Sequence, residues 1–300
     1  MSVRASTVYV VAKHSQFQKH VLDRKDARAI ELLARHDPVV ARWKRADARH
    51  RRTLDAVLSR LEKLGASTKV VTSLNMRFSP RDAALVLSVG GDGTLLSASH
   101  NIGAEPLLGV NSSPEHSVGY FCAARPENLS VMISLSLEGR LKAQALTRMS
   151  VYVNDRLRSS RVLNEVLYSH RIPAAVSRYI LEYRGKAEEQ RSSGFWIGTA
   201  AGSTGALHSA GGRKMPLQSS QLQLVVREPY TPPGMAIAMR RLTVPKGQAL
   251  FARTKMDQAV LFLDGPYRRI HVGLGDVVRF EASPEHLNVL GIGKQHSGRG

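Results

Sequence analysis

A tight turn rich in glycine surrounds a single carboxylate. Its sequence is Gly90-Gly91-Asp92-Gly93-Thr94, directly after an apolar run and before a segment of helical composition. Glycine allows positive φ angles and a close approach of the backbone to a ligand, so the N–H groups of such a turn suit a phosphate. Asp92 would repel that phosphate unless it contacts a metal ion, a hydroxyl group or a proton to be removed. These residues therefore indicate phosphoryl transfer to an alcohol, with Asp92 orienting the hydroxyl and accepting its proton.

The same turn differs from two other phosphate-binding motifs. We expect Gly90, Gly91, Gly93 and Thr94 to bind phosphate, aided by the helix dipole if Thr94 begins a helix. The chain has no G-x-x-x-x-G-K-[ST] motif, and Leu96 stands where a G-x-G-x-x-G fingerprint from Gly91 needs its last glycine. A P-loop and a simple dinucleotide fingerprint are therefore excluded. A purely structural turn remains the alternative for this segment.

Two further polar segments interrupt apolar sequence. The run WIGTAAGSTGALHSAGG, residues 196–212, places Ser203 and Thr204 between glycine bends, where hydroxyl and amide groups could hold a ribose, an amide or a phosphate. The alternative is a small-residue turn between strands. Asn164 and Glu165 stand inside what we expect to be one apolar strand, and buried polar groups need partners. Structural hydrogen bonding and ligand binding both stay open for this pair.

The elements that must position these residues divide the chain into two domains. Residues 7–12 and three later apolar runs predict strands, and their alternation with helices is typical of a parallel sheet. Residues 23–64 carry apolar side chains at helical spacing, with a break near Asp37-Pro38. The later strand-like runs are residues 68–74, 83–89 and 106–111. We therefore predict an α/β N-terminal domain with a Rossmann-like parallel sheet, residues 1–142, that carries the glycine turn.

The pattern of the sequence changes at about residue 143. Short strand-like runs separated by Gly, Pro and Asn turns are typical of a β-sandwich. The predicted second domain is therefore β-rich and sandwich-like, and it covers residues 143–285. The tail, residues 286–300, could return to the first domain.

Composition limits the classes of partner. Lys and Arg total 43 against 24 Asp and Glu, and the formal charge of +19 favours polyanions such as nucleotides, polyphosphate or nucleic acid without choosing among them. Cys122 is the only cysteine, which suits a reducing compartment and a buried thiol. His170 and His208 lack neighbours at metal-ligand spacing. No run approaches the roughly 18 apolar residues of a membrane span, and the N-terminus does not resemble a secretory signal, so we expect a cytoplasmic protein.

The three polar segments occur in the order and approximate spacing of the NAD kinase family, whose members phosphorylate the 2′-hydroxyl of the adenosine ribose of NAD or NADH. The glycine turn resembles the family's first motif, LNEV at residues 163–166 resembles its Asn-Glu motif, and TAAGSTGALHSAGG resembles its Gly-Ser-Thr-rich motif. NSSPEHSVGYFCAA, residues 111–124, is similar to the family segment after the fourth strand. The run RSSGFWIGTAAGSTGALHSAGGRKMPLQSSQLQLVVREP most resembles the plant type of ATP:NADH kinase. The resemblance extends over residues 80–265 and leaves out the basic N-terminal helices.

The resemblance implies substrates, an assembly and site residues. It implies a dinucleotide held between the two domains, ATP or polyphosphate as donor with Mg²⁺ or Mn²⁺, no tightly bound organic cofactor, and a homodimer or larger homo-oligomer. Asp92 would be the base or orienting carboxylate at the 2′-hydroxyl. The other implied contacts are Gly93 and Leu96 at the same end, Tyr120 and Phe121 near ribose and base, Asn164 and Glu165 on ribose hydroxyls or the base end, and Thr204, Gly205 and Ser209 on the nicotinamide side.

Three positions depart from many bacterial members of the family. Ser193 stands where those members have an acidic residue, and Gly205 and Ala206 stand where they have alanine and tyrosine. Oxidised nicotinamide is cationic and reduced nicotinamide is neutral, so Ser193 removes an attraction specific to the oxidised form. Such a charge pair at about 4 Å is worth roughly 4 kcal/mol at an effective dielectric near 20, before desolvation. We therefore expect NADH to be accepted at least as well as NAD.

Functions from other classes stay open on the sequence alone. Lipid and sugar kinases share a Gly-Gly-Asp-Gly turn, but the other two segments argue against them. The remaining alternatives are a nucleotide-binding protein without catalysis and a nucleic-acid-binding protein. Asp92 weighs against the first, and an aromatic content of 6% offers few side chains for base stacking. The sequence therefore predicts an NAD(H) kinase whose partners are its substrates rather than a membrane or nucleic acid.

Overall fold

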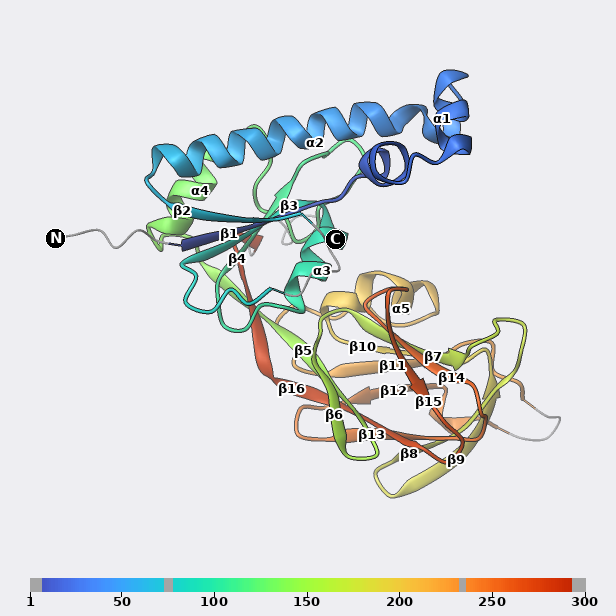
Figure 1. Cartoon of the computed structure of the whole chain (residues 1–300). Coiled ribbons are helices and arrows are strands. Elements are labelled where there is room, and N and C mark those ends of the chain that lie inside the picture. Colours follow the sequence, from blue (N-terminus) through green and yellow to red (C-terminus); the bar gives the residue numbers. More distant parts are fainter. Residues whose placement is uncertain (1–6, 73–77, 232–235, 293–300) are drawn as a thin grey trace. The chain divides into compact units, whose positions relative to one another are not determined.

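The computed structural model describes residues 7–72, 78–231 and 236–292, and the chain forms two compact units (Figure 1). Unit 1 consists of Met1–Gln144 and Leu287–Gly300, and unit 2 consists of Ala145–His286. The sequence placed this boundary at residues 142 and 143 and the start of the returning tail at residue 286. Residues 293–300 of that tail lie outside the described residues.

Unit 1 contains a parallel sheet. Its strands are β1 (Thr7–Ala12), β2 (Ser67–Val71), β3 (Leu85–Gly90), β4 (Leu107–Asn111) and the last residues of β16 (Val277–Leu290). The order is β2-β1-β3-β4, and Val289 of β16 pairs in parallel with Leu107 of β4. Every residue of β3 and β4 is buried, as expected for strands covered on both faces. The four predicted strands are confirmed, although residues 73 and 74 of the second run lie outside the described residues.

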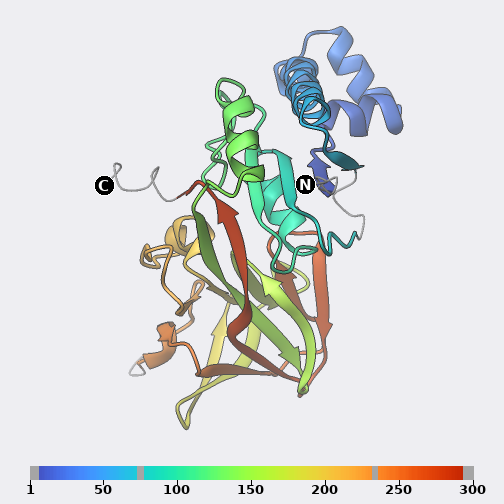
Figure 2. The same cartoon turned by 90° about the vertical axis from the view of Figure 1, so that its left-hand side faces the viewer.

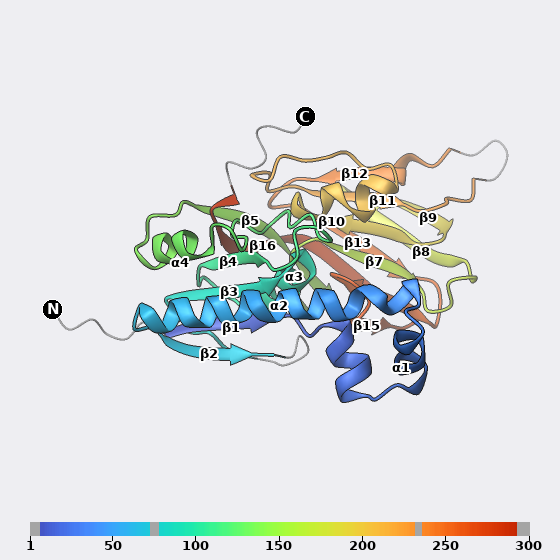
Figure 3. The same cartoon turned by 90° about the horizontal axis from the view of Figure 1, so that it is seen from above.

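Helices cover both faces of this sheet. The helices of unit 1 are η1 (Gln18–Asp23), α1 (Ala27–Ala34), α2 (Pro38–Lys63), α3 (Asp92–Ser99) and α4 (Leu129–Leu137). α2 and α3 pack against the strands, whereas α1 and α4 pack against α2. The predicted break is confirmed, because Pro38 begins α2 and the Asp37 side chain caps it by accepting a hydrogen bond from Val39 N–H at 2.9 Å. α2 lies on one face against β2 and β3, and α3 lies on the other (Figures 1 and 3); Figure 2 views α2 nearly along its axis. No helix among the described residues is long and apolar enough to cross a membrane.

Unit 2 is built from antiparallel strands. Its elements are β5 (Ala143–Val153), β6 (Arg156–Val162), β7 (Glu165–His170), β8 (Ser177–Tyr183), β9 (Lys186–Ser192), β10 (Phe195–Gly198), η2 (Ala201–Thr204), α5 (Ala206–Ser209), β11 (Leu222–Val226), η3 (Ala238–Arg240), β12 (Arg241–Val244), β13 (Ala249–Thr254), β14 (Ala259–Leu263), β15 (Arg268–Val272) and most of β16. One sheet has the order β12-β11-β10-β7-β14-β15. The other contains β16, β13, β8 and β9, with β5 paired to β16 and β6 paired to β5. The predicted β-rich class is confirmed, whereas β9, β13, β15 and all but the last two residues of β6 were not predicted.

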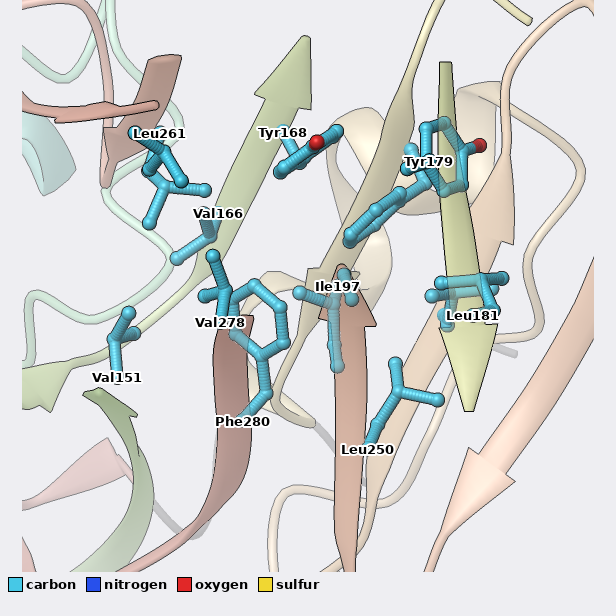
Figure 4. Close-up of a cluster of buried hydrophobic side chains, with 14 of the residues drawn as sticks. Val151, Val166, Tyr168, Tyr179, Leu181, Ile197, Leu250, Leu261, Val278 and Phe280 are labelled. Atoms are coloured by element: carbon cyan, nitrogen blue, oxygen red, sulfur yellow. The ribbon is translucent and has the colours of Figure 1, made fainter. Parts of the chain in front are cut away.

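Aromatic side chains join the two sheets of unit 2. Phe195 of β10 stacks on Tyr168 of β7 with ring centroids 4.8 Å apart. From the other sheet, Tyr179 and Phe280 meet Phe195 edge-on at 5.1 and 5.9 Å. Figure 4 shows Tyr168, Tyr179 and Phe280 directed into one buried cluster, to which Phe195 also belongs. The cluster fixes β7 and β10, whose ends carry the second group of candidate site residues.

Candidate functional site

The glycine turn lies where β3 ends and α3 begins. β3 ends at Gly90, and Asp92 is the first residue of α3, so the helix begins before Thr94, the start considered from the sequence. Thr94 N–H donates to Gly91 O at 3.0 Å. The N–H groups of Gly91, Asp92 and Gly93 have no acceptor among the residues that the structure describes. The turn therefore presents backbone donors at the start of the helix.

Both carboxylate oxygens of Asp92 accept hydrogen bonds from the loop after β4. Tyr120 N–H donates to Oδ2 and Phe121 N–H donates to Oδ1, each at 2.8 Å. The sequence predicts that this carboxylate contacts a metal ion, a hydroxyl group or a proton to be removed, and it gives no sign of these backbone partners. The structure adds that the main chain fixes the plane of the half-buried carboxylate, while each oxygen keeps a further lone pair. Asp92 is thus oriented before any ligand binds.

The three glycines of the turn have different surroundings. A Cβ on Gly90 would clash with the Thr94 side chain, and one on Gly91 would lie 2.5 Å from Ser117 Oγ. No atom of the described residues lies within 4 Å of a Cβ placed on Gly93. Close packing therefore requires glycine at the first two positions, and Gly93 leaves open space beside Asp92.

Apolar and aromatic candidates lie around the turn. Leu96 stands one helical turn after Asp92 and is half-buried. Tyr120 is half-buried and Phe121 is buried, with their rings edge-on and their centroids 5.0 Å apart. Burial raises the pKa of the Tyr120 phenol. Burial, followed by the charge of Asp92, raises the pKa of the Cys122 thiol to about 12, so this cysteine is a protonated, unreactive core residue.

The Asn-Glu pair lies at a break between two strands, so the expectation of one continuous apolar strand was wrong. β6 ends at Val162 and β7 begins at Glu165. Asp264 causes the break: its carboxylate accepts hydrogen bonds from Leu163 and Asn164 N–H at 2.8 Å and from Glu165 N–H at 3.1 Å. Three N–H groups that converge on one carboxylate cannot continue a strand. Asp264 was not among the predicted site residues, although the sequence LFLDG places it at the end of an apolar run.

The glycine-rich segment packs closely against this pair. A Cβ on Gly202 would lie 2.7 Å from Glu165 Oε2 and 2.5 Å from Asn164 O, so the approach needs glycine. Burial, followed by the charge of Asp264, raises the pKa of Glu165 to about 7. Asn164 Oδ1 is buried and accepts no hydrogen bond from the described residues. A buried acceptor of this kind indicates a donor supplied from outside the chain.

The rest of the glycine-rich segment forms two short helical turns, η2 and α5, after β10. Ser203 is fully buried, with Oγ donating to Ala200 O at 2.7 Å and accepting from Met215 N–H at 2.9 Å. This serine therefore has a structural role. The exposed candidates of the segment are Thr204, Gly205 and Ser209.

Ser193 lies at the other end of β10 from the Asn-Glu pair. Gly198 ends β10 and pairs with Glu165, whereas Ser193 lies in the turn before Phe195, the first residue of the strand. Ser193 N–H donates to Arg227 O at 3.1 Å. Within unit 2 the structure therefore brings Asn164 and Glu165 together with Gly202 and does not bring Ser193 to them.

Relatives of the chain share most of its length. A scan against models of protein families finds no match. Over 263 residues the chain is 32% identical to the probable NADH kinase of Oryza sativa, covering 80% of this chain and 81% of the relative. It is 34% identical over 253 residues to the NADH kinase of Arabidopsis thaliana, covering 77% and 80%. The chain belongs to the NAD kinase family. An archaeal NAD kinase, from Methanothermobacter thermautotrophicus, is 30% identical over 218 residues, covering 71% and 73%.

Solved structures of NAD kinases share the fold. The NAD kinase of Archaeoglobus fulgidus in complex with ATP matches with a TM-score of 0.68 at 20% identity, over 96% of this chain and 94% of that one. The yeast NADH kinase complexed with NADH matches with a TM-score of 0.66 at 14% identity, over 96% and 84%. The predicted family and fold class, an α/β domain followed by a β-rich domain, are therefore confirmed.

Proposed function

We propose that this member of the NAD kinase family transfers the γ-phosphoryl group of ATP to the 2′-hydroxyl of the adenosine ribose in NADH or NAD. The observation that carries the proposal is the Asp92 carboxylate, oriented by Tyr120 and Phe121 N–H beside the backbone donors of the glycine turn. The names of the plant and archaeal relatives, NADH kinase and NAD kinase, support the same reaction.

Asp92 serves as the base. A carboxylate whose plane is fixed takes the 2′-hydroxyl proton on a lone pair that the main chain leaves open. The hydroxyl oxygen forms the new bond to phosphorus, the bond from phosphorus to the ADP oxygen breaks, and the proton ends on Asp92. Gly90 and Thr94 shape the turn. The N–H groups of Gly91 and Gly93 stabilise the charge of the transferred phosphoryl group, and they do not have to reorient to do so.

The dinucleotide contacts of this proposal come from the family resemblance and from the surroundings of Asn164 and Glu165. Asn164 Oδ1 needs a donor, which a ribose hydroxyl supplies. Glu165, with its pKa raised to about 7, can donate or accept a hydrogen bond near neutral pH. The remaining proposed contacts are Gly93, Leu96, Tyr120 and Phe121 in unit 1, and Ser193, Thr204, Gly205 and Ser209 in unit 2.

The divalent ion enters with the donor. Among the described residues no three His, Cys, Asp or Glu side chains stand together as a metal site. Mg²⁺ is commonly held by one or two carboxylates together with substrate phosphates, and Asp92 at the turn fits such a shared site. We therefore propose Mg²⁺ or Mn²⁺ bound with ATP, which would offset the charge of the phosphates. No tightly bound organic cofactor is expected.

Assembly and compartment complete the proposal. A homodimer or larger homo-oligomer follows from the family resemblance, and light scattering on the purified protein measures it. The single cysteine, Cys122, is buried and unpaired, which suits a reducing cytoplasm. Fractionation of cells that contain the tagged protein tests that location.

A matrix of donors and acceptors tests the reaction. The purified protein is incubated with ATP or polyphosphate and with NAD or NADH, and NADP(H) is measured by chromatography. Formation of NADP(H) from ATP supports the proposal. Transfer only to a lipid or sugar would identify the other kinase class, and steeply salt-dependent DNA binding without NADP(H) would identify a nucleic-acid-binding protein.

A further inference from the structure

The strand order of unit 1 marks one edge of the parallel sheet. Along the order β2-β1-β3-β4 the direction of winding reverses between β1 and β3. In open α/β sheets, ligands bind outside the carboxyl ends of the strands at such a reversal. The segments that follow β1 and β3 therefore flank the ligand. The glycine turn follows β3, and Lys13 directly follows β1.

Lys13 lies against the glycine turn. Its N–H donates to Val89 O at 2.9 Å, which extends the pairing of β1 with β3. A Cβ built on Gly90 would lie 3.2 Å from Lys13 Cβ and would clash with Thr94 of α3. The lysine stem therefore starts on the α3 side of Gly90. Its flexible chain lets the ammonium group reach the backbone donors of the turn.

A buried network holds these strand ends together. His50 of α2 and Ser112, directly after β4, are both buried, with His50 Nδ1 and Ser112 Oγ 3.1 Å apart. Ser112 N–H donates to Gly90 O at 2.8 Å. The contact of Ser112 with His50 holds the ends of β3 and β4 to α2, and the hydrogen bond from Lys13 N–H to Val89 O adds the end of β1. These bonds keep Lys13 beside Gly90.

No carboxylate among the described residues neutralises the Lys13 ammonium group. Lys13 is exposed and forms no ion pair within that part of the chain. The nearby Asp47 already accepts a hydrogen bond from Ser15 at 2.6 Å and pairs with Arg51 at 2.8 Å. Burial, followed by the charge of Lys13, lowers the pKa of His50, so the ring remains neutral near neutral pH. A cation without an opposing carboxylate, next to the N–H groups of the glycine turn, suits an anionic ligand.

We propose that Lys13 binds the phosphate groups of the donor nucleotide during transfer. This inference rests on the proposed function. Lys13 precedes residues 80–265, over which the family motifs were recognised in the sequence, and no sequence motif identified it. Asp92 receives the acceptor hydroxyl, and of the two substrates the triphosphate carries the greater negative charge at the reacting end. The lysine therefore acts as a point charge on the donor rather than on the dinucleotide.

Two substitutions at Lys13 and one matched control test the assignment. Lys13→Gln removes the charge at similar length, and Lys13→Arg keeps the charge. Lys44→Gln removes the same charge from an exposed position on α2. For each protein we measure kcat, the KM values for ATP and NADH, the Kd for ATP with Mg²⁺ by calorimetry without acceptor, and the melting temperature.

Loss of one hydrogen bond to a charged group predicts a Kd and a KM for ATP about 10- to 100-fold higher in Lys13→Gln. Lys13→Arg should recover most of this loss, and the KM for NADH should stay within about twofold in both. ATP binding by Lys13→Gln equal to that by Lys44→Gln would overturn the assignment, as would a change confined to NADH. If Lys13→Gln does not fold, the uncharged Lys13→Met takes its place and is compared with Lys13→Arg. Equally weak ATP binding by these two variants would overturn the assignment. A wild-type protein that forms no NADP(H) would refute the proposed function itself.

Discussion

The carboxylate of Asp264 accepts a hydrogen bond at 2.8 Å from the backbone N–H of Asn164. It also holds the N–H groups on either side, at Leu163 and Glu165. Asn164 therefore lies between β6 and β7, where a carboxylate rather than a neighbouring strand accepts the hydrogen bond of its N–H group, and Glu165 begins β7. This relationship assigns Asp264 a positioning role at the proposed dinucleotide site.

Asp264→Asn should weaken both the local fold and the binding of the dinucleotide. The amide presents an N–H group where three backbone donors converge, so we expect a loss of about 1–3 kcal/mol in stability. The KM for NADH should rise at least about tenfold, with a smaller change in the KM for ATP. Asp276→Asn is the control, since Asp276 holds Gly273 N–H at 2.8 Å in another turn. Equal effects of the two substitutions on the KM for NADH would contradict the role of Asp264.

Asp92→Asn should fold and yet lose most of its turnover. The amide oxygen can accept one of the two backbone hydrogen bonds from Tyr120 and Phe121, but the amide cannot accept the proton of the hydroxyl. Removal of a general base lowers kcat by about 10²- to 10⁴-fold. Steady-state kinetics and circular dichroism check both parts, with Asp55→Asn on the exposed face of α2 as control. Normal turnover in the variant would remove Asp92 from the chemistry.

Glu165 should make the folded protein less stable as the pH rises. Its folded pKa of about 7 lies above the ordinary value of 4.5, because burial and the charge of Asp264 disfavour the carboxylate. The stability it contributes is complete below the unfolded pKa and is lost as the pH rises through the folded pKa. Glu165→Gln should therefore gain on the order of 2 kcal/mol relative to wild type between about pH 5 and about pH 8.

Chemical denaturation at the two pH values measures this difference. The exposed Glu62→Gln on α2 serves as the matched control. An unchanged stability difference between Glu165→Gln and wild type across this range would show that Glu165 titrates as an ordinary glutamate.

Gly202→Ala and Gly93→Ala should separate structural from functional glycine. A Cβ on Gly202 meets Asn164 O at 2.5 Å, and backbone cannot yield as a flexible side chain would. This variant should lose about 1–3 kcal/mol of stability, the usual range for overpacking. Gly93→Ala should have a melting temperature close to that of wild type, because no described atom lies within 4 Å of a Cβ at this position. Its kcat/KM should fall, because the added methyl group enters the space proposed for the substrate. The opposite ranking in a melting experiment would contradict this account.

Ser193→Asp should shift the preference of the enzyme towards NAD. A carboxylate near the nicotinamide attracts the cationic oxidised ring and leaves the neutral reduced ring unaffected. The wild type should accept NADH at least as well as NAD, and the ratio of kcat/KM values for NAD and NADH should rise at least about tenfold in the variant. Ser193→Asn controls for size. A wild-type kcat/KM many-fold higher for NAD would contradict the expectation.

Local residue patterns were sufficient for many elements, and they named the candidate residues of the proposed site. The β-branched run of β1, the break at Asp37-Pro38 and the glycine turn between β3 and α3 each depend on residues close together in the chain. Motif resemblance supplied the family. The strands β6, β9 and β15 were missed because charged residues interrupt them, and β13 was missed because its apolar run, Ala249–Ala252, is short.

Taken alone, the sequence determined which residue types could do the chemistry and the local backbone that carries them, since propensity, capping and glycine turns act over a few neighbouring residues. Only the tertiary structure decided what holds the two carboxylates: Asp92 meets a donor 28 residues away, and Asp264 meets one 100 residues away. It also placed Lys13 beside Gly90 and Gly202 against Glu165. A carboxylate has no local sequence signal for its distant donors, because their approach depends on how the sheets and helices pack.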